Sequence, residues 1–440
     1  METKNGKPSV TIVTLGCCKN LVDSEVLIRQ LHAGGIAVSH NPQNNISKRV
    51  IINTCGFIND AKEESIDTIL NFVNAKQQGI VSELYVMGCL SERYRHELSK
   101  EIPEVDGFFG VSELQNILRS VGADYRKELL GERHLTTPNH YAYLKISEGC
   151  DRKCSFCAIP LIRGKHQSKT IEEILNEAKY LASVGVKELI LIAQDTTYYG
   201  LDIYGKRRLP DLLQQLTLIN GIEWIRLHYA YPNAFPEKTL SVINSSPKIC
   251  KYLDIPIQHI SDPILKAMKR SHSNGYTRKL IEKIRNQIPG VALRTSIIVG
   301  FPGETNEQFD ELKNFISEVK FDRLGVFTYS HEENTKAYKL KDDISAATKR
   351  KRASELMALQ QQISFDINRK KIGTSLRVII DRKDGDFWIG RSEFDSPEVD
   401  NEILIPSTFP LKEGSLVKVK ITDAEAVSYT HLTLPTIYSV

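Results

Sequence analysis

Hydrophobic positions in the first part of the chain alternate between strand-like and helix-like spacing. Three short runs rich in β-branched residues, Ser9–Leu15, Arg49–Asn53 and Glu83–Met87, predict buried strands. After the second run, apolar residues between positions 66 and 73 recur at the spacing of one helix face. Repeated strand–helix units of this kind predict an open parallel sheet with helices on both faces.

A longer series of the same kind follows Leu135–His140, a polar segment that contains Pro138 and predicts a linker. Six apolar runs with helical patterns between them predict further strands, at Tyr141–Ile146, Glu188–Ala193, Trp224–Tyr229, Tyr252–Ile257, Leu293–Val299 and Arg323–Thr328. Such a series predicts a complete or partial (β/α) barrel of the TIM type. Its active site would lie at the C-terminal ends of the strands.

The pattern changes again near the end of the chain. Ala346–Lys371 predicts a basic helical connector, which is either a solvated linking helix or a contact to RNA or an acidic surface. From Ser375 onward, short strands with turn signals predict a small all-β barrel similar to an OB-fold. The expected fold class is therefore α/β, with an N-terminal open parallel α/β domain, a partial TIM-like barrel and a small C-terminal barrel.

The last residues differ in character from the rest of the chain. Val427–Thr436 resembles the translation of a transposon-end sequencing adapter. We predict that residues 427–440 are a non-native tail, the alternative being a genuine terminal strand.

Composition narrows the class of protein. A chain of 440 residues suggests roughly three domains. Its 41% hydrophobic and 25% charged residues are typical of a globular protein with full cores. The sequence has no apolar stretch of membrane-spanning length and no secretory signal at its start, so we expect a cytoplasmic protein. A net charge of +4 does not require a nucleic-acid partner.

Eight cysteines in such a chain favour metal binding or catalysis over disulfides. Cys150, Cys154 and Cys157 form a CxxxCxxC pattern directly after the first predicted barrel strand. Three thiolates would leave one iron of a 4Fe–4S cluster open to a substrate. The alternatives are a structural zinc site, which usually has four ligands, or isolated buried thiols.

A second set of cysteines, Cys17, Cys55 and Cys89, follows the three predicted N-terminal strands by one or two residues. The carboxyl ends of parallel strands meet at one edge of a sheet, so these thiols could form one site. A second cluster with an open position could then bind an exogenous sulfur species. The alternative is that the three side chains are small residues of the core.

The CxxxCxxC spacing, with Phe156 before the last cysteine, resembles the signature of the radical S-adenosylmethionine (SAM) superfamily. The resemblance implies that SAM binds the open iron and is cleaved by one electron to methionine and a 5′-deoxyadenosyl radical. Polar and glycine residues at two other strand ends fit a SAM pocket, although either segment could be a simple turn. The predicted cofactor-binding residues are Phe156, Gln194, Asp195, Thr196, Gly300, Gly303 and Glu304.

Longer motifs resemble the methylthiotransferases within that superfamily. The matching segments are Leu15–Glu25, Asn53–Ile58, Ala61–Ser65, Met87–Leu90, Glu101–Gly110, Leu144–Cys150 and Cys157–Gly164. The resemblance covers essentially residues 8–425. It implies two 4Fe–4S clusters, one at each cysteine set, and a terminal TRAM domain. It also implies SAM as cofactor and a reductase or flavodoxin-type electron donor.

The expected domains follow from this resemblance. They are an N-terminal methylthiotransferase domain over residues 8–134, a radical SAM domain over 135–345, a basic linking helix over 346–372 and a TRAM domain over 373–426. The non-native tail over 427–440 would complete the chain. The terminal barrel would position the substrate.

Two segments favour one branch of the family, whose members modify an aspartate of ribosomal protein S-twelve. They are Lys19–Leu21 and Ala158–Leu161, where relatives that modify tRNA adenosine tend to carry other residues. The implied reaction removes hydrogen from the β-carbon of the aspartate and transfers a methylthio group to it. The alternatives are the same chemistry on tRNA and, in another class, a non-catalytic iron–sulfur electron carrier.

Three further residues complete the expectations. Cys18 adjoins Cys17 and could compete as a ligand, although we expect Cys17 to keep that role. Lys169 stands where an arginine is frequent in the family. Cys250 has no motif around it and is expected to be an ordinary thiol. No catalytic residue is predicted beyond the cluster ligands.

Overall fold

The computed structural model describes residues 9–426 together with the short segments 428–429 and 432–433. The chain divides into two compact units. The first comprises residues up to 137, 143–152 and 157–181, and the second comprises 138–142, 153–156 and the chain from 182 onward. Most of the predicted tail lies outside the described residues. The described part of the tail consists of β18 (Ser428–Tyr429) and β19 (Leu432–Thr433).

The first unit contains a five-stranded parallel sheet in the order β2-β1-β3-β4-β5. Its strands are β1 (Ser9–Thr14), β2 (Ala37–His40), β3 (Arg49–Thr54), β4 (Glu83–Gly88) and β5 (Gly107–Phe109). The three strands predicted from the sequence are β1, β3 and β4. The sequence pattern missed β2 and β5, because these short, partly exposed strands carry no long apolar run.

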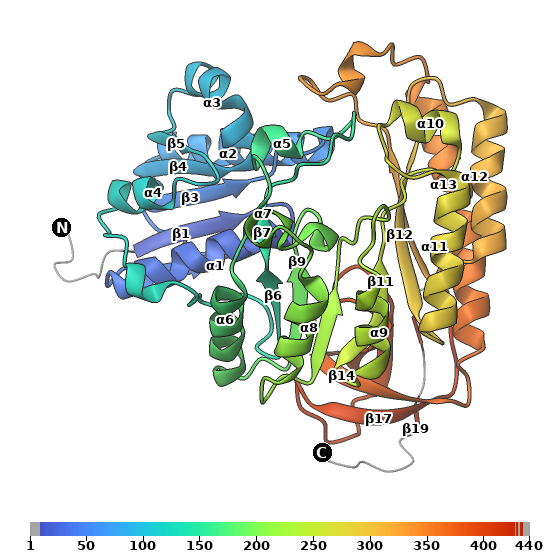
Figure 1. Ribbon diagram of the computed structural model, residues 1–440. Helices are drawn as coiled ribbons and strands as arrows, with labels where there is room; N and C mark the ends of the chain where they lie inside the picture. The colour runs from blue at the N-terminus through green and yellow to red at the C-terminus, as the bar shows by residue number, and fades with distance from the viewer. Residues whose placement is uncertain (1–8, 427, 430–431, 434–440) are drawn as a thin grey trace. The chain divides into compact units, whose positions relative to one another are not determined.

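Helices cover both faces of this sheet, as the N-terminal pattern predicts (Figure 1). Helices α1 (Cys18–Ala33) and α4 (Leu114–Ser120) contribute buried residues such as Leu27 and Ile117 to the core on one face. Helices α2 (Asn59–Gln77) and α3 (Cys89–Glu101) contribute Ile69 and Leu98 to the core on the other face. The unit also includes the hairpin of β7 (Ser147–Glu148) and β8 (Gln167–Ser168), with α5 (Ile159–Ile162) and most of α6 (Ile171–Ser183).

The second unit contains parallel strands in the order β13-β12-β11-β10-β9. Their bounds are Glu188–Ile192 for β9, Trp224–Leu227 for β10, Ile249–Asp254 for β11, Ala292–Val299 for β12 and Arg323–Thr328 for β13. The sixth predicted strand is β6 (Tyr141–Lys145). Strand β13 lies at an edge of the sheet, so these strands form a partial barrel rather than a complete one.

One strand is displaced from its predicted position. Strand β11 ends at Asp254, whereas the apolar run predicted a strand that continues to Ile257. Pro256 has no backbone N–H to donate to a neighbouring strand, and Gln258 has a φ of 71°. Regular strand pairing therefore ends at Asp254, and Gln258 forms only an isolated bridge with Ile297 of β12.

Helices of the second unit follow its strands along the chain and flank the sheet (Figure 1). They are α8 (Leu209–Thr217), α9 (Lys238–Ser245), α10 (Asp262–Ala267), α11 (Asn274–Gln287), α12 (Asn306–Val319) and α13 (Ala346–Arg369). No helix among residues 9–426 combines the length and apolar character needed to span a membrane.

Helix α13 occupies the predicted basic connector, but two of its basic side chains are not solvated. Lys349 and Arg352 are 7% and 6% exposed. Lys349 Nζ donates to Asp342 at 2.7 Å, and Arg352 Nη1 donates to Glu304 Oε1 at 2.9 Å. These two ion pairs attach the helix to neighbouring loops of the second unit, whereas the side chain of Arg350 is exposed.

The chain after α13 forms an antiparallel sheet with the order β16-β15-β14-β17 at its centre. Its strands are β14 (Ser375–Asp384), β15 (Phe387–Ser392), β16 (Glu402–Pro406) and β17 (Leu416–Ile421). It packs against the amino ends of the parallel strands, where Ile379 of β14 meets Trp224 and Tyr252 (Figure 1). The expected terminal barrel therefore lies opposite the carboxyl ends of the parallel strands.

A chain of buried charges joins the two sheets of the second unit. Glu188 pairs with Arg226 at 2.7 Å and with Arg391 of β15 at 2.8 Å, and all three side chains are at most 2% exposed. Arg391 also pairs with Asp381 at 2.6 Å, and His140 Nε2 lies 2.7 Å from the same carboxylate. Removing one member of such a group leaves a buried charge without its partner, which is strongly destabilising.

We predict that Arg391→Met lowers the free energy of unfolding by about 3–5 kcal/mol, because it leaves Glu188 and Asp381 without their shared cation. The matched control is Arg382→Met, which removes an exposed pair with Glu402 and should cost less than about 1 kcal/mol. Urea denaturation of the full chain measures both values. Equal costs for the two variants would contradict a structural role for the buried network.

Candidate functional site

Cys17, Cys55 and Cys89 follow three adjacent strands of the first unit. Cys17 follows β1, Cys55 follows β3 directly, and Cys89 follows β4 directly. In the order β2-β1-β3-β4-β5, β2 lies on one side of β1, and β3 and the later strands lie on the other. The strand order therefore reverses between β1 and β3, which is the point where ligands bind in open α/β sheets. The structure thus brings the three predicted thiols to one edge of the sheet.

Glycines beside the three cysteines allow the strand ends to approach closely. A Cβ on Gly16, whose φ is 85°, would lie 2.7 Å from Cβ of Cys55. A Cβ on Gly56 would lie 2.7 Å from Cα of Leu90, and one on Gly88 would lie 2.7 Å from the carbonyl oxygen of Thr54. There is no room for a side chain at any of these positions, so glycine is a condition for forming the site.

Asn20 on helix α1 fastens the strand ends together. Its Nδ2 donates to the carbonyls of Leu15 at 2.9 Å and Thr54 at 3.0 Å, immediately before the first two cysteine segments. Its Oδ1 accepts from the Cys89 thiol at 3.4 Å. Asn20 is fully buried, and one side chain therefore contacts or adjoins all three cysteine-bearing segments.

Arg163 approaches the same place. Its Nη2 lies 3.4 Å from Cys89 Sγ and donates to Asn20 Oδ1 at 2.5 Å. Its Nη1 donates to Asp23 at 2.7 Å and to Glu148 at 3.2 Å. A guanidinium group can serve these partners at once because its donors are arranged in a fixed planar fork.

Burial keeps two of the three thiols protonated in the absence of a metal. Burial raises the pKa of the Cys89 thiol to about 12, although the neighbouring Arg163 acts in the opposite direction. Burial likewise raises the pKa of Cys55, whereas Cys17 is exposed at the start of α1. Iron binds the thiolate form, so metal binding must displace these protons.

The donor set fits a cluster better than a single ion. In residues 9–426, no three Cys, His, Asp or Glu side chains are grouped closely enough to hold one metal ion. A structural zinc site usually takes four protein ligands, whereas cysteine thiolates are the usual ligands of iron–sulfur clusters. Three thiols on separate strand ends, with an arginine beside one of them, suit the larger group.

The CxxxCxxC segment forms a loop between β7 and α5, and its three cysteines are half-buried. The start of the loop is fixed within the first unit, where the amide of Cys150 donates to the carbonyl of Gly164 at 3.1 Å. Cys150 Sγ accepts from the amide of Arg152 at 3.4 Å. Gly149 has a φ of 76°, and a Cβ there would collide with the carbonyl of Lys165.

Cys154 belongs to the second unit and has an arginine of its own. Arg270 Nη1 lies 3.6 Å from Cys154 Sγ, and its guanidinium stacks 4.2 Å from the ring centre of Tyr231. Its other nitrogen donates to the carbonyl of Pro256 at 2.5 Å. Phe156, two residues after Cys154, packs against an apolar cluster of the second unit that includes Met268.

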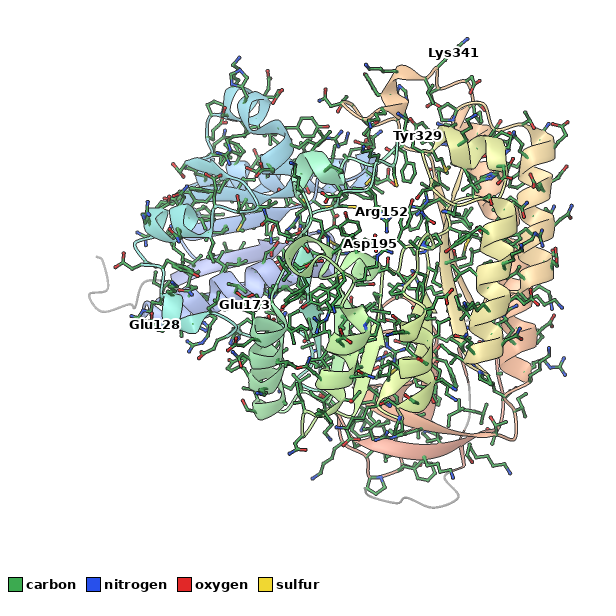
Figure 2. All side chains as sticks on the ribbon, viewed as in Figure 1. Glu128, Arg152, Glu173, Asp195, Tyr329 and Lys341 are labelled. Atoms are coloured by element: carbon green, nitrogen blue, oxygen red, sulfur yellow. The ribbon has the colours of Figure 1, made fainter. Side chains whose placement is uncertain are left out.

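The predicted SAM residues after β9 are mostly engaged with the protein. Asp195 caps the short helix Thr196–Tyr198, because its Oδ1 accepts from the amide and hydroxyl of Thr197 at 2.9 and 2.6 Å. Thr196 Oγ1 donates to the carbonyl of His228 at 2.9 Å. Gln194 is half-buried. Figure 2 shows Asp195 and Tyr329, which follow β9 and β13, at the carboxyl ends of the strands.

The loop after β12 has a similar internal support. Glu304 is 4% exposed, and its Oε2 accepts from the amides of Gly300 at 2.7 Å and Phe301 at 3.3 Å. Gly300 has a φ of 73°, and a Cβ there would lie 2.3 Å from Lys349 Cγ. Gly303 has open space around it. Through these contacts the Glu304 side chain holds the shape of the loop that follows β12.

The remaining three residues singled out in the sequence have ordinary surroundings. Cys250 is 2% exposed and packs with Trp224 and Ile379, so it lies in a core. Lys169 Nζ donates to Glu177 at 2.7 Å. Cys18 is the first residue of α1 and is half-buried.

Comparison with protein families gives three matches along the chain. Residues 9–110 match the uncharacterized protein family UPF0004, residues 144–316 match the radical SAM superfamily, and residues 372–429 match the TRAM domain. A protein of Flavobacterium psychrophilum named ribosomal protein uS12 methylthiotransferase RimO is 58% identical, over 96% of this chain and 98% of its own length. The protein of the same name from Christiangramia forsetii is 56% identical, over 96% and 94%.

The chain belongs to the RimO family. It is a radical SAM methylthiotransferase, which is the reaction class predicted from the sequence. The fold is shared more widely. The radical SAM methyltransferase TsrM from Kitasatospora setae aligns over 72% of both chains with a TM-score of 0.55 and 13% identity.

Several residues of this RimO-family site were not assigned roles from the sequence. Asn20, Asp23 and Arg163 all fall within the family motifs, but a motif match does not say which side chain each one contacts. Arg270 lies in no motif and could be found only in three dimensions. The available sequence signal for Asn20 and Asp23 was their position as polar residues shortly after Cys17.

We predict that Gly56→Ala destabilises the RimO-family chain by about 1–3 kcal/mol, because the added Cβ would overlap the backbone of Leu90. Gly275→Ala is the matched control, because a Cβ at Gly275 meets nothing within 4 Å. Urea denaturation measures both. Equal stability of the two variants would contradict the proposed close approach of the strand ends.

Proposed function

We propose that this enzyme adds a methylthio group to the β-carbon of an aspartate in ribosomal protein uS12. The observation that carries the proposal is similarity over nearly the whole length of proteins named uS12 methylthiotransferase, at 58% and 56% identity. The cysteine sets and the loops at the carboxyl strand ends are consistent with it. A reductase or flavodoxin-type protein would supply the electrons.

The proposal assigns two 4Fe–4S clusters to the chain. Cys150, Cys154 and Cys157 would hold the cluster that supplies an electron and an open iron for SAM cleavage. The second set, Cys17, Cys55 and Cys89, would hold the cluster that carries the sulfur to be transferred. Three features support the second assignment: shared position at one sheet edge, glycine neighbours, and an arginine beside one thiol.

The SAM pocket would form at the carboxyl ends of the strands of the second unit. We assign four residues to direct contact: Phe156, Gln194, Gly300 and Gly303. The last three follow β9 and β12, and Phe156 packs against the cluster that contains Phe301. The other predicted members would act through the loops that they hold. They are Asp195, Thr196 and Glu304.

The substrate assignment is tested with anaerobically reconstituted enzyme, SAM, a reductant, and a uS12 peptide that contains the target aspartate. We expect the peptide to gain one methylthio group in place of a hydrogen, measured by mass spectrometry. A peptide with asparagine at the target position is the control. Modification of tRNA with no change in the peptide would overturn the substrate.

Separate variants test the division of labour between the two cysteine sets. We predict that Cys150→Ala abolishes SAM cleavage, because it removes a ligand of the radical-generating cluster. Cys55→Ala should keep SAM cleavage but lose methylthio transfer. Cys250→Ala, in the core, is the control and should retain both reactions. Normal transfer by Cys55→Ala would refute the second assignment.

We predict that Arg270→Lys weakens iron binding at Cys150, Cys154 and Cys157 by about 10–100-fold, the usual cost of removing a group that orients a metal ligand. Lysine has no planar fork to bridge Cys154 and Pro256. Iron release to a chelator is followed in a chain that lacks Cys17, Cys55 and Cys89. The control, Arg285→Lys on the surface of α11, should release iron at the original rate.

A further inference from the structure

We propose that Arg163 is a positioning residue that raises the reduction potential of the cluster held by Cys17, Cys55 and Cys89. It would do so by donating a hydrogen bond to the sulfur of Cys89. The inference rests on the proposed function, which assigns a cluster to these cysteines. It assigns Arg163 a role in the sulfur-donating half of the reaction.

The geometry fixes Arg163 on the sulfur. Its side chain is 3% exposed, and Nη2 lies 3.4 Å from Cys89 Sγ. Three further bonds hold the guanidinium: Nη1 to Asp23 and Glu148, and Nη2 to Asn20. Rotating the donor away from the sulfur would break these bonds inside a buried site, so the contact is part of the folded structure.

Metal binding would strengthen this contact. In the protonated state the Cys89 thiol donates to Asn20 Oδ1 at 3.4 Å. A thiolate has no proton to give, so Asn20 Oδ1 would then depend on Arg163, which already donates to it at 2.5 Å. Cys89 would become a charged acceptor facing a charged donor, which is the stronger kind of hydrogen bond.

The charges around Arg163 determine the sign of its effect. Arg163 and Lys145 are balanced by Asp23 and Glu148, since Lys145 Nζ lies 2.5 Å from Asp23 and 2.7 Å from Glu148. The group is formally neutral, but its positive end touches the sulfur. A thiolate-bound cluster becomes more negative on reduction, and hydrogen bonds to its sulfurs are one factor that sets the potential. The donor therefore stabilises the reduced form.

This effect favours the transfer step itself. If the cluster supplied a methylthio group to a carbon radical of the substrate, a C–S bond would form and a S–Fe bond would break. One electron of the broken bond would join the carbon radical's electron in the C–S bond, and the other would stay on iron. Iron would thus be reduced by one electron, so Arg163, by stabilising the reduced state, would make the transfer more favourable.

The test measures the potential of the one remaining cluster in the full chain carrying Cys150→Ala, Cys154→Ala and Cys157→Ala. The protein is reconstituted with iron and sulfide, and reduction is followed by electron paramagnetic resonance during a redox titration. We expect Arg163→Met to lower the reduction potential by about 59 mV, which corresponds to a tenfold change in the equilibrium constant of a one-electron reduction. Arg163→Lys, which keeps the charge but not the fork, should fall between.

A variant of opposite sign separates this role from a merely structural one. Asp23→Asn removes a negative charge from the same group and should raise the potential. Arg29→Met is the matched control, because the Arg29 guanidinium pairs with Glu132, and it should leave the potential unchanged. If Arg163→Met does not retain iron, Arg163→Lys and Asp23→Asn still give the sign of the effect.

The possible outcomes separate a failure of the role of Arg163 from a failure of the proposed cluster assignment. Unchanged potentials in the Arg163 and Asp23 variants, with the iron content retained, would overturn the role of Arg163 and leave the cluster assignment standing. Failure of the triple-alanine chain with intact Arg163 to bind iron would instead overturn the assignment of Cys17, Cys55 and Cys89.

Discussion

The hydrogen bonds of Asn20 hold together the ends of β1 and β3, and the chemistry of the first unit depends on that junction. Cys17 and Cys55 follow these two strand ends, and the Cys89 thiol reaches the same amide side chain. The junction is possible only because glycine replaces a side chain next to each cysteine. The hydrogen bonds of Asn20 and the glycines beside the cysteines thus act on neighbouring parts of the same strand ends, and neither would bring three thiols together alone.

The second constraint is the buried charge that each of the two units must neutralise. At the cysteine edge, Arg163 balances Asp23 and Glu148 while it touches a sulfur. At the amino ends of the barrel strands, Glu188 is shared by two arginines from different sheets. The first group acts on the site that we assign to sulfur transfer. The second group locks the terminal sheet to the barrel.

The position of the terminal sheet could not be predicted from the sequence. The sequence favoured a terminal barrel that positions the substrate at the active site. The structure has this sheet at the amino ends of the strands, whereas the loops containing Asp195 and Gly300 leave the carboxyl ends. The role of this sheet in positioning the substrate stays a prediction, and any such contact would be made away from those strand ends.

Sequence patterns predicted most strands, and the cysteines that follow them, because these features can be read from short local segments. The apolar runs gave β1, β3, β4 and the barrel strands, but edge strands as short as Gly107–Phe109 leave no periodic signal. The contacts of Arg163 and Arg270 could not be predicted, because their partners are distant in the chain. The same is true of Lys349, whose charge looked solvated in the sequence but is buried against Asp342.

The central claim is that two separate three-cysteine sites each hold a cluster. Iron analysis of the reconstituted chain tests this claim most directly. The account predicts about eight iron atoms per chain, and about four after replacement of either Cys17, Cys55 and Cys89 or Cys150, Cys154 and Cys157 by alanine. A chain without Cys17, Cys55 and Cys89 that still bound about eight iron atoms would contradict it.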